Sequence, residues 1–125
     1  MESVERMAKV LLAEDDQTMV DLLTTLLRMD GYEVAAVDAD DDVAAAVQRY
    51  CPDFLVLDLL LSNQNGLDVV DAIRKVNGNH HLHIIMISGL NFRDQAIRRG
   101  ADDFLLKPFM PDDLMSLLRR NVKAQ

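Results

Sequence analysis

The segment Phe54-Leu55-Val56-Leu57-Asp58 places one carboxylate directly after four apolar residues. A short run that is apolar at every position is typical of a strand covered by helices on both faces of a parallel sheet. Three further apolar runs also end on polar residues, which are Glu14-Asp15-Asp16, Ser88 and Lys107-Pro108. Because ligands bind outside the carboxyl ends of parallel strands, these residues predict one shared polar site.

Helical stripes alternate with these runs. Asp16 is a predicted N-cap, and the inner face of the helix after it is expected to consist of Met19, Leu22, Leu23, Leu26 and Leu27. Asp40 or Asp41 should start the second helix, and Asn91 should cap a short fourth helix that ends at Gly100. Five β-α units in series predict an α/β fold, a doubly wound five-stranded parallel sheet with helices on both faces.

The composition limits the class of protein. A chain of 125 residues fits one domain, for which we predict the limits 1–125 and a core of about 9–122. A net charge of −8 disfavours direct binding of nucleic acid by this domain. No apolar run approaches the roughly 20 residues that span a bilayer, and residues 1–9 lack the apolar core of a signal peptide. With Cys51 as the single cysteine, these features predict a cytoplasmic protein that does not bind membranes.

The predicted site is rich in acidic groups. Glu14, Asp15 and Asp58 would converge if the first and third strands were neighbours. Two like charges 4 Å apart repel by about 4 kcal/mol at an effective dielectric constant of about 20, which favours a bound cation or a shifted pKa. Mg²⁺ prefers carboxylate and phosphate oxygens, and donors such as Lys107 and Ser88 stabilise phosphoryl oxygens during transfer. The set therefore favours a metal-dependent phosphoryl site over acids that only cap helices.

Four segments resemble, in order, the receiver domain of two-component response regulators. They are Val10–Asp16, Pro52–Asp58, Ile84–Gly89 and Gly100–Phe109, and the likeness extends from about Lys9 to Val122. It implies a flavodoxin-like fold with strand order 2-1-3-4-5. It also implies a phosphorylation-controlled signalling switch in a phosphorelay rather than an enzyme, with a sensor histidine kinase or a histidine phosphotransfer protein as its partner.

The resemblance assigns roles to the acidic residues. Asp58 would accept the phosphoryl group from a phosphohistidine. Asp15 and Asp58 would bind Mg²⁺ (or Mn²⁺), with Glu14 close to the metal and Leu60 contributing its backbone carbonyl. The kinase would dock near Met19 and Leu23 on the first helix.

The resemblance also implies a switch. Lys107 would pair with Asp58 or its phosphoryl group, and the Lys107–Pro108 peptide bond would be cis. Ser88 would hydrogen-bond a phosphoryl oxygen, which would let Phe104 turn inward and change the surface formed by the fourth helix, fifth strand and fifth helix. A homodimer could use that surface through charged residues, namely Arg98, Asp102, Asp103 and Arg119.

Three departures from the family pattern are visible. Ser62 stands where relatives often have proline, so the loop after Asp58 is expected to be more mobile. Phe104 lacks the hydroxyl of the tyrosine found in many relatives. Leu60 and Leu90 put apolar side chains beside the phosphoryl site, and we predict that they hinder attack by water and lengthen the phosphoryl lifetime.

Other interpretations start from the same residues. A phosphatase or phosphotransferase with an aspartyl-phosphate intermediate is disfavoured because related enzymes carry a second aspartate where this chain has Leu60. A receiver-like scaffold that acts without phosphorylation is a further alternative. His80, His81 and His83 could suggest a metal cluster, but a solvated loop before the fourth strand is the favoured interpretation.

Overall fold

The sheet has the predicted topology. The computed structural model describes residues 7–38, 40–76 and 79–122, within which five parallel strands form one sheet of order β2-β1-β3-β4-β5. The strands are β1 (Lys9–Ala13), β2 (Glu33–Ala36), β3 (Phe54–Asp58), β4 (His83–Ser88) and β5 (Asp103–Leu106). The expected fold class is confirmed. The predictions made for residues 1–6 and 123–125, as leader or domain limits, lie outside the described residues.

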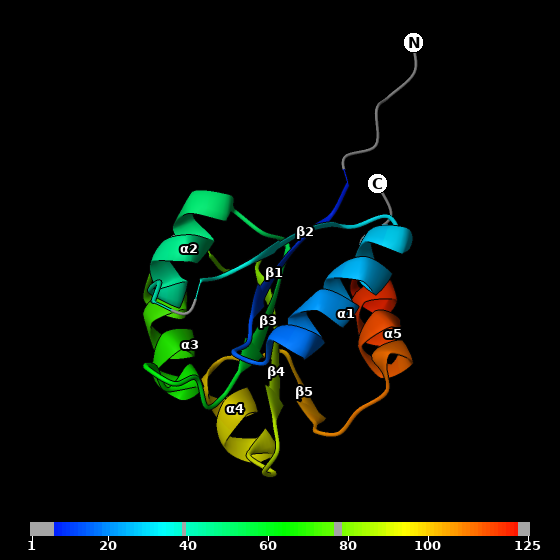
Figure 1. Ribbon diagram of the computed structural model, residues 1–125. Helices are drawn as coiled ribbons and strands as arrows, with labels where there is room; N and C mark the ends of the chain where they lie inside the picture. The colour runs from blue at the N-terminus through cyan, green and yellow to red at the C-terminus, as the bar shows by residue number, and fades with distance from the viewer. Residues whose placement is uncertain (1–6, 39, 77–78, 123–125) are drawn as a thin grey trace.

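Helices cover both faces of this sheet (Figure 1). They are α1 (Gln17–Met29), α2 (Val43–Tyr50), α3 (Gly66–Lys75), α4 (Arg93–Arg99) and α5 (Pro111–Asn121). Helices α1 and α5 pack on one face, while α2, α3 and α4 pack on the other. Among the described residues, none of the helices has the length and apolar character needed to cross a bilayer.

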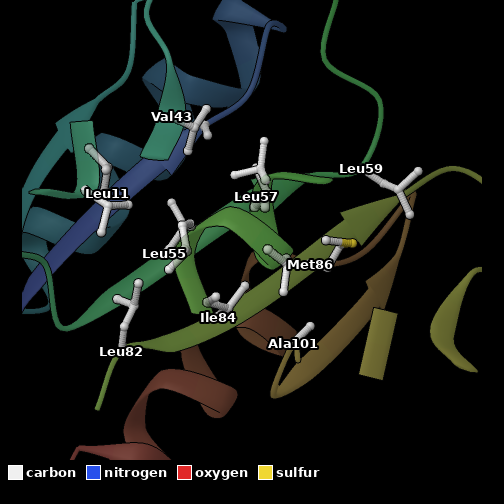
Figure 2. Packing of buried hydrophobic residues seen from close by; sticks show 14 of the residues in the cluster. Leu11, Val43, Leu55, Leu57, Leu59, Leu82, Ile84, Met86 and Ala101 are labelled. Atoms are coloured by element: carbon white, nitrogen blue, oxygen red, sulfur yellow. The ribbon is translucent and has the colours of Figure 1, made fainter. Parts of the chain in front are cut away.

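The central strand β3 is buried along its whole length. Its alternate side chains enter different cores, because successive residues of a strand point to opposite faces of the sheet. Leu55 and Leu57 pack toward α2 and α3, as Figure 2 shows together with their neighbours on β4. Phe54 and Val56 pack toward α1 and α5. This burial fixes the position of Asp58, the last residue of β3, at the carboxyl ends of the strands.

The buried face of α1 differs from the predicted one. Asp16 caps the helix as expected, and its side chain accepts a hydrogen bond from the Met19 backbone N–H at 3.2 Å. However, Val20, Leu23 and Leu27 form the buried row, and Leu22 is 50% exposed. The assignment of Leu22 to the inner face was therefore wrong. The docking of the kinase on this helix near Met19 and Leu23 stays a prediction. A row of spacing i, i+3, i+7 that starts at Val20 satisfies the same helical period.

Two helix starts also differ from the predictions. Asp42, rather than Asp40 or Asp41, caps α2 through a hydrogen bond from the Ala44 N–H. Helix α4 begins after Phe92, although the Asn91 side chain accepts the N–H of Arg93 at 3.2 Å. In an acidic or polar run several side chains can cap a helix, and tertiary packing selects among them.

The edge strand β2 carries a side-chain contact on its outer side. The N–H groups of Glu33 and Val37 donate toward β1, so the intervening Val34 carbonyl points away from the sheet. That carbonyl accepts a hydrogen bond from the Arg28 guanidinium of α1 at 3.2 Å.

Candidate functional site

Polar residues from three strand ends meet around one ammonium group. Glu14 follows β1, Asp58 ends β3 and Lys107 follows β5. The Lys107 Nζ lies 2.6 Å from Glu14 Oε1 and 2.8 Å from Asp58 Oδ2. The fold thus brings together residues up to 93 positions apart, as the parallel arrangement of their strands predicts.

Burial sets the electrostatics of this cluster. The side chains of Glu14 and Asp58 are only 5% and 10% exposed. Burial raises the pKa of Glu14, and the neighbouring Asp58 raises it further, against the opposing effect of Lys107. Burial alone would lower the pKa of Lys107, but its hydrogen bonds to Asp58 and Glu14 raise that pKa above its ordinary value. Lys107 therefore stays cationic and partly offsets the repulsion between the two acids.

Both carboxylate oxygens of Asp58 accept hydrogen bonds, which orient its side chain. Oδ2 accepts from Lys107, and Oδ1 accepts the backbone N–H of Leu60 at 3.0 Å. The Leu60 side chain is 58% exposed, so the position contributes its backbone to the site and an apolar group to the surface.

Gly66 allows α3 to start directly behind Asp58. Its N–H donates to the Leu59 carbonyl, and a Cβ atom at this position would lie 2.7 Å from Leu59 Cα and 2.9 Å from the Asp58 carbonyl oxygen. Only glycine fits such an approach of backbone to backbone. The need for glycine at this position was not predicted from the sequence. The available signal was the Asn65-Gly66 pair, since Asn65 caps the helix that Gly66 begins.

Asp15 lies apart from the other two acids. Its Oδ2 accepts the backbone N–H of Ser62 at 2.7 Å, on the exposed side of the site. As they stand, no three His, Cys, Asp or Glu side chains of residues 7–38, 40–76 and 79–122 form a group that could hold a metal ion. The predicted convergence of three carboxylates is therefore incomplete, because Lys107 lies between Glu14 and Asp58 while the loop holds Asp15.

The donor set nevertheless fits a divalent cation. Three carboxylates and one ammonium group carry three negative charges and one positive charge, which leaves a net charge of −2 in this cluster. All the available ligands are oxygens, which Mg²⁺ prefers. A cation of charge +2 would balance the cluster formed by Glu14, Asp15, Asp58 and Lys107.

Ser88 is buried, and its hydroxyl group can donate a hydrogen bond as well as accept one. The residue is 1% exposed at the end of β4, and its Oγ accepts the Leu90 backbone N–H at 3.1 Å. Its hydroxyl hydrogen can still donate to an acceptor. The Ser88 carbonyl accepts the N–H of Lys107 at 2.7 Å, and the Lys107–Pro108 peptide bond is cis.

Phe104 is already inside the core. It is 3% exposed, and the Arg93 guanidinium carbon lies 5.6 Å from the centre of its ring. Arg93 also donates to the Phe104 carbonyl at 3.0 Å. The expected inward turn of Phe104 is therefore corrected, because a ring without a hydroxyl packs in the apolar core and needs no rotation to reach it.

At the amino ends of the strands, His83 is the first residue of β4 and not part of the preceding loop. Its Nε2 lies 2.6 Å from the Asp103 carboxylate. The prediction of a solvated loop was thus wrong for His83, since this residue pairs in register with Phe54 of β3. His80 and His81 lie in the connection before β4, as predicted.

Arg74 joins several segments at the amino ends of the strands, and the sequence did not predict this role. Its guanidinium donates to the Gly100, Asn79 and Leu82 carbonyls and to the Asp102 carboxylate, at 2.8 to 3.0 Å. Backbone carbonyls leave no trace in the sequence, so only the position of Arg74 in the last turn of α3 could have suggested a role.

The charged residues considered for a homodimer mostly have partners within the chain. Asp102 pairs with Arg74, Asp103 with His83, and Arg119 with Asp30 at 3.2 Å. These contacts use groups that the homodimer prediction assigned to a second copy.

Comparisons with known proteins agree with this fold. A family model described as the response regulator receiver domain matches residues 10–119. The DNA-binding response regulator MtrA of Mycobacterium tuberculosis is 30% identical over 118 residues, which make up 92% of this chain and 50% of that protein. The chain spans about half the length of the curated relatives it matches.

Solved structures extend the likeness to the whole fold. A response regulator signal receiver domain from Bermanella marisrubri superposes with a TM-score of 0.84 at 30% identity, over 94% of this chain and 100% of that one. The chemotaxis response regulator CheY4 of Vibrio cholerae gives a TM-score of 0.81 at 27% identity over the same shares. The shared fold and the match over residues 10–119 show that the chain belongs to the response regulator receiver domain family.

Proposed function

We propose that Asp58 accepts a phosphoryl group from the phosphohistidine of a sensor histidine kinase or a histidine phosphotransfer protein. The observation that supports this role is the pairing of Lys107 with Asp58 and Glu14 at the carboxyl edge of the sheet. A phosphorus–oxygen bond forms to the Asp58 carboxylate while the phosphorus–nitrogen bond of the donor breaks. The imidazole leaves with the electron pair and is protonated by solvent. Lys107 stays positive beside the negative charge on the transferred group.

The reaction is proposed to depend on Mg²⁺, or on Mn²⁺. Asp15, Asp58, Glu14 and the Leu60 carbonyl are the groups that would hold the cation, directly or through water. When bound, such a cation neutralises phosphoryl charge and orients the transferred group. The net charge of −2 in the cluster supports this assignment.

Ser88 is the proposed link between phosphorylation and the rest of the chain. A phosphorylated aspartate adds negative charge and strong acceptor oxygens, to which the Ser88 hydroxyl can donate. Because Ser88 Oγ also holds the Leu90 N–H, its movement would shift the start of the segment that leads to α4. We propose that the surface of α4, β5 and α5 changes in this way, with Phe104 remaining buried.

The wider setting is proposed from the chain and its relatives. We infer a signalling domain with its core at about residues 9–122, working in the cytoplasm. It binds neither nucleic acid nor membrane itself, although relatives such as MtrA are named as DNA-binding regulators. A homodimer through α4, β5 and α5 stays a prediction.

Intact-protein mass after incubation with acetyl phosphate and Mg²⁺ tests the proposal. The expected result is one phosphoryl adduct on the wild type, and none with Asp58→Asn or with EDTA. Circular dichroism of Asp58→Asn controls for folding. An adduct that persists in Asp58→Asn would contradict the assignment. No adduct on the folded wild type would favour a scaffold that acts without phosphorylation.

A further inference from the structure

One hydrogen bond joins the loop after β1 to the loop after β3. The backbone N–H of Ser62 donates to Asp15 Oδ2 at 2.7 Å, across 47 positions of sequence. We propose that this N–H competes with a divalent cation for the Asp15 carboxylate, so that binding of the cation releases the segment 61–63. The inference rests on the proposed function, because it takes Asp15 to be a metal ligand.

The position of Asp15 supports a competition. The carboxylate is exposed and bonded to the loop, whereas Glu14 and Asp58 are buried around Lys107. Mg²⁺ demands a nearly octahedral set of oxygens at about 2.0–2.1 Å. The acids of the described residues form no such group as they stand, so we take completion of the site to involve movement of Asp15 toward Asp58. Movement toward Asp58 either breaks the bond to Ser62 or pulls the loop along.

The loop is anchored on both sides of Ser62, which favours breakage. On one side, the Leu60 N–H donates to Asp58 Oδ1. On the other side, the Gln64 side chain donates to the Asp41 carbonyl at 2.8 Å and accepts the Val43 N–H at 3.1 Å. With these anchors in place, only the short segment between them can respond. Ser62 acts through its backbone, so it is a positioning residue and its hydroxyl is dispensable.

The first test uses the wild-type protein without any variant. Amide signals are followed by ¹H–¹⁵N NMR, with hydrogen exchange, as MgCl₂ is added. We expect the Ser62 amide to be protected without Mg²⁺ and to lose protection as the signals of Glu14 and Asp58 shift. A Ser62 amide that stays protected at saturation, or is never protected, while Asp58 shifts would overturn the inference alone. If no signal near Asp58 responds, the proposed metal site fails and the inference fails with it.

The second test compares two substitutions at one position. Ser62→Pro removes the N–H, and Ser62→Ala keeps it. By calorimetric titration with MgCl₂ we expect Ser62→Pro to bind about 2- to 10-fold more tightly than Ser62→Ala, the range expected for one net hydrogen bond. Equal or weaker binding by a folded Ser62→Pro would overturn the inference. If Ser62→Pro does not fold, the exchange experiment decides.

Discussion

The carboxyl edge of the sheet, where the strands end, and the amino edge, where they begin, differ in how their charged side chains are paired. At the carboxyl edge, Glu14 and Asp58 share the ammonium group of Lys107, and with Asp15 the cluster keeps a net charge of −2. At the amino edge, the Arg74 guanidinium has four acceptors, and the carboxylates of Asp102 and Asp103 are paired with Arg74 and His83. We call the amino edge complete, because both carboxylates have side-chain partners there, and the carboxyl edge incomplete, because its cluster keeps a net charge of −2. The pairing at the complete edge favours a role in stability, whereas the incomplete edge is the one where we propose that a cation and a phosphoryl group bind.

The largest expected effect is at the complete edge. Arg74→Ala removes the guanidinium that donates to three backbone carbonyls and to the Asp102 carboxylate, so we expect a loss of about 2 to 4 kcal/mol in the free energy of unfolding. Urea denaturation measures it. The control is Arg99→Ala, which removes exposed pairs with Asp68 and Asp71 and should cost less than about 1 kcal/mol. Similar losses for the two variants would contradict the special role of Arg74.

The next effect concerns the backbone behind the incomplete edge. Gly66→Ala forces a Cβ atom against the Leu59 backbone, and we expect a loss of about 1 to 3 kcal/mol together with slower phosphorylation by acetyl phosphate. Gly89→Ala is the matched control, because a Cβ atom there meets nothing within 4 Å. The idea fails if both alanine variants denature at the same urea concentration.

Replacing aspartate by asparagine should affect the free energy of unfolding differently at the two edges. Asp58→Asn relieves repulsion with Glu14, so stability should stay unchanged or rise by about 1 kcal/mol while phosphorylation is lost. Asp102→Asn removes the charge that pairs with Arg74 and should cost about 1 kcal/mol. Thermal denaturation of both variants measures the difference. An Asp58→Asn variant less stable than the wild type would contradict the expectation.

The raised pKa of Glu14 predicts how stability depends on pH. The unfolded chain loses this proton near pH 4.5, before the folded protein does, so the folded state binds more protons above that pH. Stability therefore falls as the pH rises from 4.5 through the higher pKa of the folded state. Glu14→Gln should remove this decline and be more stable than the wild type at pH 7. Urea denaturation from pH 4 to 7 tests the difference, and an unchanged slope would refute it.

The smallest expected effect concerns the phosphoryl lifetime at the incomplete edge. Leu60 and Leu90 are 58% and 59% exposed, and an amide in place of Leu60 could position water for attack. Leu60→Asn should shorten the lifetime about threefold, the effect of one modest hydrogen bond. Decay of the phosphorylated protein is followed by mass, with the half-exposed Leu22→Asn as control. Equal lifetimes for Leu60→Asn and the wild type would remove any role for the leucine.

The sequence predicts the carboxyl edge better than the amino edge. An all-apolar run such as Phe54–Leu57 marks a buried strand, and the polar residue after it marks the strand end. Periodicity leaves the rotation of a helix open by one residue, which is why Leu22 was placed inside instead of Val20. The partners of Arg74 are mostly backbone carbonyls, and the constraint on Gly66 comes from a strand positioned by tertiary packing. Neither has a pattern that a single sequence displays.

The contact between Arg28 and the Val34 carbonyl has a consequence for self-association. Strand β2 ends the sheet on one side, and an open edge offers backbone groups to any extended chain. The guanidinium occupies an acceptor that an added strand would use, and it places a positive charge where that strand would have to lie. Because α1 carries this arginine, the helix that covers one face of the sheet also protects the sheet's edge against aggregation.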